Sequence, residues 1–404
     1  MSTRGESEPA ASAGRLLVLS FALLAPYLIG RAWIASTWPY QQGFDDFDHI
    51  PAALEWAQHR RLTSGGLFLR VPLWHILLGS FFLVFGTTAG LFVLQASIVW
   101  GTLLAYLTYV ERVLHRDARG LLLLPPLAFV SSPQVLLYGR HAVNEPFLGL
   151  LAVGVLLVGA LAFRGRAVVL GLLCGAGSMT KTIATALVIP ALTDLLAART
   201  RTGRTRALAL FAVGMAVVVA PLVTLHFVQR GPVPLDTTAA YNLSTFEPRQ
   251  WLAQGDHMAR HAAGMQAWRA DIAADPAGYL ADFAGRFATW WARPGSADFA
   301  HFYRDYPHAW IRAWDHGVLY AFLLLAAFGT RRRHLSVWAF LAILAVGCTF
   351  PRHTPYSPKL ILIFPTLLLA ASGILRLSDR LPARAGRTRE QAPVSDPVRA
   401  TTSR

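Results

Sequence analysis

The feature that most constrains this chain is a series of long apolar stretches, separated by short connections that are rich in arginine. Of its 404 residues, 54% are hydrophobic and only 15% are charged, and this apolar content exceeds that of a typical soluble domain. One soluble core of this size could not bury so many apolar stretches, whereas a lipid bilayer solvates them directly. The sequence therefore predicts an all-α membrane protein that crosses the bilayer many times.

About ten membrane spans are expected when each span is given about 20 mostly apolar residues. The predicted spans are residues 16–34, 89–111, 119–137, 147–163, 166–180, 182–198, 207–227, 316–330, 335–350 and 360–376. The first span lacks a clear small-residue cleavage site, which favours an uncleaved anchor over a signal peptide. The fifth and sixth spans are short, and the sequence leaves their boundary near Lys181 open.

The basic residues predict the orientation of these spans. A net charge of +15 would suggest a nucleic-acid partner in a soluble protein, but here the arginines lie between apolar stretches, which favours membrane lipids and no nucleic acid. With a cytoplasmic N-terminus, every arginine cluster lies on the cytoplasmic face, as the positive-inside rule requires. We therefore expect a multi-pass protein of a bacterial plasma (inner) membrane with both termini in the cytoplasm.

This topology divides the chain into five parts. They are a cytoplasmic N-terminus at 1–15, a transmembrane region at 16–227 with an outer loop at 35–88, an extracytoplasmic segment at 228–315, C-terminal transmembrane helices at 316–376, and a disordered basic cytoplasmic tail at 377–404. Within the outer loop, residues 71–85 form a stretch too short for a comfortable span, which predicts a helix lying in the membrane interface. The alternative, a true short span, would move the later arginine clusters to the outer face. An amphipathic helix is expected at 277–292.

Ionisable residues at membrane depth are unfavourable and therefore indicate functional sites. The first cluster comprises Asp45, Asp46, Asp48 and His49, just beyond the first span. Neighbouring carboxylates repel one another, and such a group could act as a general base on a hydroxyl or help to hold a divalent cation. The competing interpretation is a solvated loop whose acids cap the following helix.

Three further clusters fall on the same predicted outer face. In the second, Glu145 starts the fourth span, where a helix N-terminus favours its anionic form, and the Arg140 guanidinium suits a phosphate or carboxylate. His141 lies between them. The third is Lys181, which follows a glycine-rich stretch between two short spans. The fourth contains Arg352 and Lys359, which suit a lipid-linked phosphate or a lipid headgroup. The two cysteines provide neither a disulfide framework nor a metal-ligand spacing.

At these motifs the sequence resembles the GT-C superfamily of membrane glycosyltransferases. The nearest likeness is to the branch that contains protein O-mannosyltransferases and bacterial aminoarabinose transferases. The resemblance covers most of the first 200 residues. It rests on the acidic pair at 45–46, the interfacial stretch at 71–86 that ends in Phe-Gly, Ser-Pro at 132–133, the second acidic motif at 139–146 and the glycine-rich stretch at 171–181, with a weaker echo at 352–373.

The resemblance implies transfer of a sugar from a polyprenyl-phosphate donor to a glycan, lipid or protein acceptor on the outer face, with inversion. Asp45 or Asp46 would then accept the proton of the acceptor hydroxyl, and Glu145 would orient the acceptor. The residues implied to stabilise the departing lipid phosphate are Arg140, Lys181, Arg352 and Lys359, and the auxiliary residues near the acceptor are Asp48, His49 and His141. A divalent cation, Mg²⁺ or Mn²⁺, stays open as a cofactor held by Asp46 and Glu145.

The sequence also departs from the family pattern. The usual Asp-Glu pair is Asp-Asp here, Asp48 adds another candidate base, and the second acidic motif ends in Glu145 where Asp is commoner. Two other functions therefore remain open. A transporter or flippase of lipid-linked sugars would be expected to carry charges within its spans and to show inverted repeats. A polymerase or ligase of lipid-linked glycans would use a large outer loop, for which segment 228–315 is the candidate.

Overall fold

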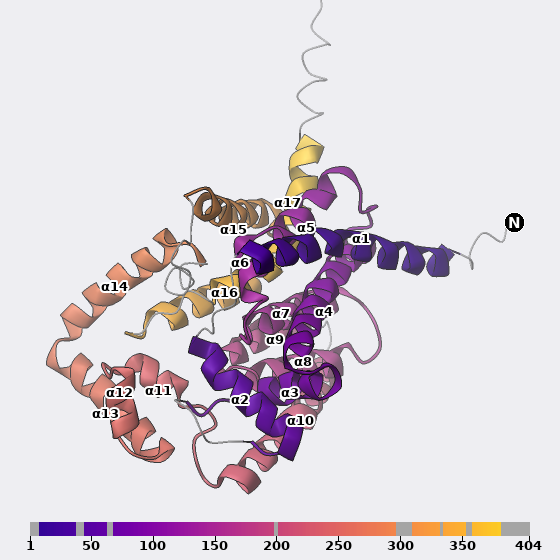
Figure 1. Ribbon diagram of the computed structural model, residues 1–404. Helices are drawn as coiled ribbons and strands as arrows, with labels where there is room; N and C mark the ends of the chain where they lie inside the picture. The colour runs from indigo at the N-terminus through magenta and orange to yellow at the C-terminus, as the bar shows by residue number, and fades with distance from the viewer. Residues whose placement is uncertain are drawn as a thin grey trace, which may run out of the picture.

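The computed structural model describes residues 8–37, 44–62, 68–197, 201–295, 309–331, 334–352 and 358–380, and every regular element in these ranges is a helix (Figure 1). The all-α prediction is thus confirmed for the described part. The principal long helices are α1 (Glu8–Thr37), α4 (Thr87–Thr108), α10 (Arg201–Arg230), α15 (Ala309–Gly329) and α17 (Lys359–Arg380). The shorter apolar helices are α3 (Leu73–Phe85), α5 (Leu124–Val130), α6 (Pro133–Tyr138), α7 (Glu145–Ala160), α8 (Arg166–Ser178), α9 (Val188–Leu196) and α16 (Leu335–Thr349).

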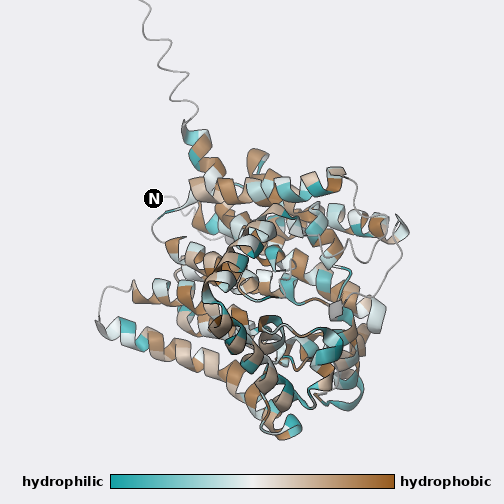
Figure 2. Cartoon of the chain, turned by 90° about the vertical axis from the view of Figure 1, so that its left-hand side faces the viewer, coloured by the Kyte–Doolittle hydropathy of each residue, from teal (hydrophilic) through white to brown (hydrophobic). Residues whose placement is uncertain are grey.

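Five helical segments are long and apolar enough to cross a membrane, which is compatible with a membrane protein. They are Ala13–Thr37, Thr87–Val113, Thr202–Arg230, Ala309–Gly329 and Lys359–Asp379. The other apolar helices are shorter than the roughly 20 residues that a perpendicular span needs. Figure 2 shows that hydrophobic residues occur along most of the helices. A count of ten spans, the GT-C fold and the orientation of the termini stay predictions.

Two predicted spans are not single α-helices. Residues 119–137 form a 3-10 turn (Gly120–Leu123), α5 and α6, so the prediction of one continuous helix is wrong. The break precedes Pro133, which restricts Ser132 to an extended conformation (φ −62°, ψ 129°) and starts α6. Residues 182–198 begin as a 3-10 helix (Thr182–Leu187) and continue as α9, with Pro190 in its first turn, where a backbone N–H has no intrahelical acceptor.

Glycines allow two helix pairs to pack with their backbones in close contact. A Cβ atom at Gly373 of α17 would collide with the carbonyl oxygen of Leu325 in α15. A Cβ atom at Gly171 of α8 would likewise collide with the carbonyl oxygen of Phe211 in α10. Small residues at helix crossings are typical of membrane proteins, in which association depends on close packing rather than on the hydrophobic effect.

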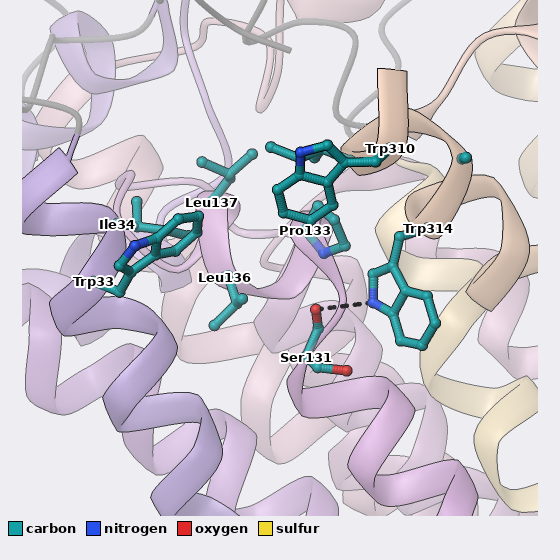
Figure 3. A pocket seen from close by; sticks show the side chains of 10 residues that line it. Trp33, Ile34, Ser131, Pro133, Leu136, Leu137, Trp310 and Trp314 are labelled. Carbon is teal, nitrogen blue, oxygen red and sulfur yellow. Dashed lines mark hydrogen bonds between the residues drawn. The ribbon is translucent and has the colours of Figure 1, made fainter. Parts of the chain in front are cut away.

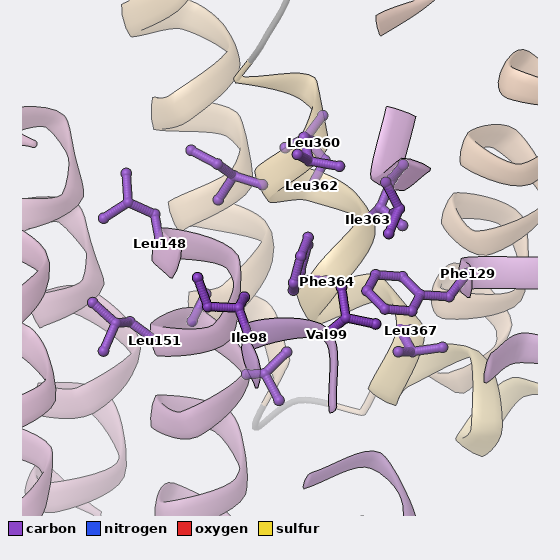
Figure 4. Close-up of a cluster of buried hydrophobic side chains, with 14 of the residues drawn as sticks. Ile98, Val99, Phe129, Leu148, Leu151, Leu360, Leu362, Ile363, Phe364 and Leu367 are labelled. Atoms are coloured by element: carbon purple, nitrogen blue, oxygen red, sulfur yellow. The ribbon is translucent and has the colours of Figure 1, made fainter. Parts of the chain in front are cut away.

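The centre of the protein is packed around α17 (Figure 4). Phe364 of α17 packs edge-to-face against Phe129 of α5, with a ring-centroid distance of 4.9 Å. Ile98 of α4 and Leu148 of α7 are buried in the same cluster. By contrast, α10 lies at the periphery, where the side chain of Val217 is 60% exposed. Burial therefore decreases outwards from α17 to α10.

Four further helices form an outer group. They are α11 (Thr238–Leu243), α12 (Pro248–Ala253), α13 (His257–Ala274) and α14 (Pro276–Ala292), and α11–α13 lie together with α14 extending from them (Figure 1). The amphipathic helix predicted at 277–292 is confirmed as α14, and Asp275 caps it by accepting a hydrogen bond from Gly278 N at 2.8 Å. The group docks onto the end of α16 because Tyr279 and Arg286 both donate to the Phe350 carbonyl oxygen at 3.0 Å.

The end of α10 fixes the connection that precedes α3. Gln229 accepts a hydrogen bond from Leu62 N at 2.6 Å and donates to the Arg60 carbonyl at 3.1 Å. Arg230 donates to the Arg70 carbonyl at 3.0 Å. We call these contacts of Gln229 and Arg230 the α10 latch. The latch ties the last turn of α10 to the entry of α3 and thereby helps to position the site described next.

Candidate functional site

The first two acidic clusters meet at Asp46. This residue lies in the first turn of α2 (Phe44–His59), so the acids belong to the helix itself and not to a loop before it. Its carboxylate is fully buried: Oδ1 accepts a hydrogen bond from Ala142 N at 2.6 Å, and Oδ2 lies 2.6 Å from Nδ1 of His141. The acid therefore holds the second motif through both oxygens and does not act as a cap before the helix.

The second motif is held from two further sides. Nε1 of Trp74 in α3 donates to the Ala142 carbonyl at 2.8 Å. Nε2 of Gln95 in α4 lies 3.1 Å from the His141 carbonyl and 3.3 Å from the Val143 carbonyl. Three helices, α2, α3 and α4, thus fix the backbone of residues 141–143. Such bracing is what a preorganised site requires.

Glu145 and Lys181 form the next part of the site. Lys181 Nζ lies 2.6 Å from Glu145 Oε1; the Glu145 side chain is 2% exposed and that of Lys181 is 21% exposed. Glu145 opens α7, where the helix dipole favours its negative charge. Asn144 donates to the Thr180 carbonyl at 3.2 Å and keeps the two segments together. The second and third predicted clusters are therefore in direct contact.

The remaining first-cluster residues have partners that the sequence did not reveal. Asp48 is buried and accepts a hydrogen bond from Nε of Arg70 at 2.8 Å. His49 Nδ1 lies 2.8 Å from His75 Nε2, and both rings are buried. Residue spacing gives no indication of these pairings, although the polar His75 on an otherwise apolar helix is a recognisable signal. The side chain of Asp45 lies outside the part that the structure describes.

Burial controls the protonation of the two histidines. Desolvation, followed by the nearby charges of Arg230 and Arg70, lowers the pKa of His75 to about 3. Desolvation also lowers the pKa of His49 well below its ordinary value, and Arg70, His75 and Lys181 add to the effect. Both imidazoles are therefore neutral at pH 7. The electrostatic effect of Lys181 on His49 indicates that the first and third clusters lie near each other.

An apolar pocket of about 630 Å³ lies beside the second motif (Figure 3). Trp33 of α1 and Trp310 and Trp314 of α15 line two of its sides, with residues of α6 between them. Arg140, which precedes His141, donates to the carbonyl of the pocket residue Ile34 at 3.4 Å. The Arg140 side chain therefore contacts the backbone of a pocket residue, and the next residue in the chain, His141, contacts the buried Asp46.

The fourth predicted cluster, Arg352 and Lys359, forms its contacts away from the other three clusters. Arg352 forms an ion pair with Asp271 of α13 at 2.6 Å and a longer one with Asp282 of α14 at 3.3 Å. Hydrogen bonding to Asp271 raises the pKa of the Arg352 guanidinium. Lys359 is buried, donates to the Arg293 carbonyl and has its Nζ 4.9 Å from the ring centroid of Trp290. These contacts fasten α13 and α14 to α16 and α17.

A divalent cation does not fit the proposed ligands as they are arranged. Both Asp46 oxygens already face N–H donors, and Glu145 faces the ammonium of Lys181. A metal ion would have to displace these groups. Among the described residues, no group of three or more histidine, cysteine, aspartate or glutamate side chains is arranged to hold a metal ion.

Comparison of the chain with protein-family models, with curated proteins and with solved structures finds no match.

Proposed function

We propose that this protein is a glycosyltransferase that moves a sugar from a polyprenyl-phosphate donor to a cell-envelope acceptor on the outer face of the membrane. The observation that supports the proposal is that Arg140 binds the backbone of a residue lining the apolar pocket, while the next residue, His141, contacts the buried acidic cluster. A lipid-phosphate sugar has the same three parts in the same order. It consists of a hydrocarbon chain, an anionic phosphate and a polar sugar.

The hydrocarbon end of the donor suits the pocket between α1 and α15. Both helices belong to the five segments that are long and apolar enough to cross a membrane. Tryptophans such as Trp33 and Trp310 are typical of the region where hydrocarbon meets headgroups. A first isoprenoid unit in this pocket would bring the attached phosphate towards Arg140.

The phosphate end calls for cations that stabilise the departing group. Arg140 offers a planar guanidinium, and Lys181 is the more exposed partner of its ion pair with Glu145. As the bond between the anomeric carbon and the phosphate oxygen breaks, negative charge grows on the phosphate, and these cations would stabilise it. Arg352 and Lys359 are left out of this step because their partners belong to α13, α14 and the Arg293 backbone.

The acceptor hydroxyl needs a group that takes its proton while its oxygen attacks the anomeric carbon. The acidic pair of the first motif, Asp45 and Asp46, is the proposed source of that base. Both Asp46 oxygens face N–H donors, so Asp46 can accept the proton only by exchanging its contact with His141 or with Ala142 N for the acceptor hydroxyl. Glu145 is proposed to orient the acceptor and to release Lys181 when the phosphate arrives. One direct displacement of this kind inverts the anomeric centre.

The test uses purified protein in nanodiscs with radiolabelled polyprenyl-phosphate sugars and a crude cell-envelope acceptor fraction. We expect transfer by the wild type, loss of at least a hundredfold in Asp46→Asn, and near wild-type transfer in Glu55→Gln, a matched change on the same helix. Ala313→Trp, which fills the apolar pocket, should raise KM for the donor with little change in kcat. Ala321→Trp, at an exposed position of the same helix, is its control.

A transporter of lipid-linked sugars would give a different result. In that case no donor would yield transfer, and the labelled lipid would cross the bilayer of proteoliposomes. That outcome would refute the transferase proposal. Equal transfer by Asp46→Asn and wild type would show that Asp46 is not the base.

A further inference from the structure

A second groove, remote from the acidic cluster, lies where the connection between α4 and α5 crosses the last turns of α17. Its volume is about 520 Å³. The connection contributes charged and polar residues, His115, Arg116, Asp117 and Arg119, together with Leu121 and Leu122. The end of α17 contributes Ile374, Leu375 and Ser378. The lining therefore combines basic and aliphatic residues.

The backbone of the connection gives the groove its form. α4 continues as a π-helical turn (Tyr109–Val113), and the chain then reverses through two residues with positive φ, His115 at 52° and Gly120 at 57°. Left-handed φ values are uncommon outside glycine and mark a specific turn. This turn places the basic residues 115–119 opposite the end of α17.

The charge of the groove favours an anionic ligand. Its single acid, Asp117, is already paired, with Arg15 at 3.3 Å and with Arg119 at 3.7 Å. Within the described residues, the Arg116 guanidinium has no ion-pair or hydrogen-bond partner and stays available to a ligand. An arginine can bind a phosphate through two parallel hydrogen bonds.

An apolar surface continues from the groove along the next helix. Leu121, Leu124 and Leu127 are 60%, 55% and 39% exposed, and their spacing of three residues places them on one face. The helical stretch that carries them, Gly120–Val130, is too short to span a bilayer. A ligand bound at the arginines therefore has an exposed apolar surface directly beside it.

We propose that this groove binds an anionic glycerophospholipid, with its phosphate at Arg116 and Arg119 and an acyl chain along Leu121, Leu124 and Leu127. Only an amphiphile uses both the arginines and the leucines. A free anion would bind the arginines but would leave the leucine side chains exposed. The site is separate from the proposed sugar transfer and does not depend on it.

The test is native mass spectrometry of the full-length protein released from detergent, titrated with phosphatidylglycerol or phosphatidylcholine. We expect the wild type to retain phosphatidylglycerol in preference to phosphatidylcholine. The Arg116→Gln/Arg119→Gln variant should lose about 30-fold in phosphatidylglycerol affinity, since each arginine near an anionic headgroup contributes about fivefold. The control is Arg204→Gln/Arg206→Gln, with the same charge change at exposed positions of α10, and it should bind like the wild type.

Two further arms separate a lipid from a simple anion. Leu121→Gln, an exposed substitution that leaves both arginines in place, should weaken phosphatidylglycerol binding. Inorganic phosphate at millimolar concentration should not displace the lipid. The proposal is overturned if the arginine variant binds as tightly as the control, if Leu121→Gln has no effect, or if inorganic phosphate competes fully.

Discussion

Asp46 and His141 are 95 positions apart in the chain, yet the Asp46 carboxylate lies 2.6 Å from the His141 ring nitrogen in a region closed to solvent. The other carboxylate oxygen binds the next backbone N–H, that of Ala142, at the same distance. One buried side chain therefore joins the beginning of α2 to the turn that precedes α7. A buried carboxylate in this position is both a structural tie and, in the proposed reaction, part of the machinery.

The first prediction concerns the structural role of this tie. Asp46→Ala leaves the N–H groups of His141 and Ala142 buried without an acceptor, so we expect the free energy of unfolding to fall by about 3 kcal/mol. Asp46→Asn should lose less, because its amide oxygen can still accept from Ala142. Thermal unfolding in detergent measures both. Glu55→Gln on the same helix should change stability by less than about 0.5 kcal/mol. Equal melting of Asp46→Ala and Glu55→Gln would contradict the prediction.

The second prediction is an asymmetry within the Glu145–Lys181 pair. Lys181→Met leaves a nearly inaccessible carboxylate without its cation, whereas Glu145→Gln leaves an ammonium that water can still reach. Lys181→Met should therefore lower the free energy of unfolding by about 1–3 kcal/mol more than Glu145→Gln does. The double variant should recover part of the loss, because no charge is then left unpaired. A double-mutant cycle followed by thermal unfolding checks both statements, and equal single losses would refute them.

The third prediction follows from the depressed histidine pKa values. Because His75 has a folded-state pKa of about 3 and an unfolded-state value near 6.5, the unfolded state binds the extra proton between these limits. The stability contribution is thus fully present above about pH 6.5 and is lost as the pH falls, by about 1.4 kcal/mol per pH unit for each such histidine. Unfolding measured from pH 7 to pH 5 should be less pH-dependent in His75→Leu than in the wild type. The exposed His59→Leu serves as control, and parallel curves for both variants would disprove the assignment.

The fourth prediction tests the glycine contacts between helices. Gly373→Ala forces α17 away from the Leu325 carbonyl of α15 and should lower the free energy of unfolding by about 1–3 kcal/mol. Gly317→Ala lies on α15 with open space around it, so it should be neutral or stabilise the helix by up to about 1 kcal/mol. The melting temperature should therefore fall in Gly373→Ala and stay the same or rise in Gly317→Ala. Similar losses at both glycines would mean that the crossing is looser than described.

Much of the helix placement could be predicted from apolar runs alone, because a helix buried in lipid or protein keeps its apolar residues contiguous. Amphipathic patterning also predicted helices at 71–85 and 277–292, and both segments are helical in the structure, while the interfacial position of the first stays a prediction. Local breaks were harder to predict, as the division before Pro133 shows. The start of α2 was placed too late, because its first turn is rich in acids whose partners come from distant segments.

The residues of the candidate site could be predicted from the sequence, but their contacts could be predicted only in part. Glu145 and Lys181 were both singled out, and the structure joins them. The local sequence does not indicate the ion pairs Arg352–Asp271 and Arg70–Asp48. Which residues pair across long sequence separations depends on how the helices pack. Arg352 and Lys181 were predicted to lie on the same membrane face, yet the structure places them in different clusters.

The α10 latch also bears on the order in which the protein can be completed during translation. Arg230 follows the Arg70 carbonyl that it binds by 160 positions. At the usual rates of synthesis, of about 5–20 residues per second, the ribosome needs roughly 8–30 s to make that interval. The nascent α2 and α3 must therefore remain without their α10 partner while the ribosome adds 160 of the 404 residues of the chain. Until then the Leu62 N–H and the Arg60 and Arg70 carbonyls must bind another partner, such as water, lipid headgroups or insertion machinery, and that partner must leave when the latch forms.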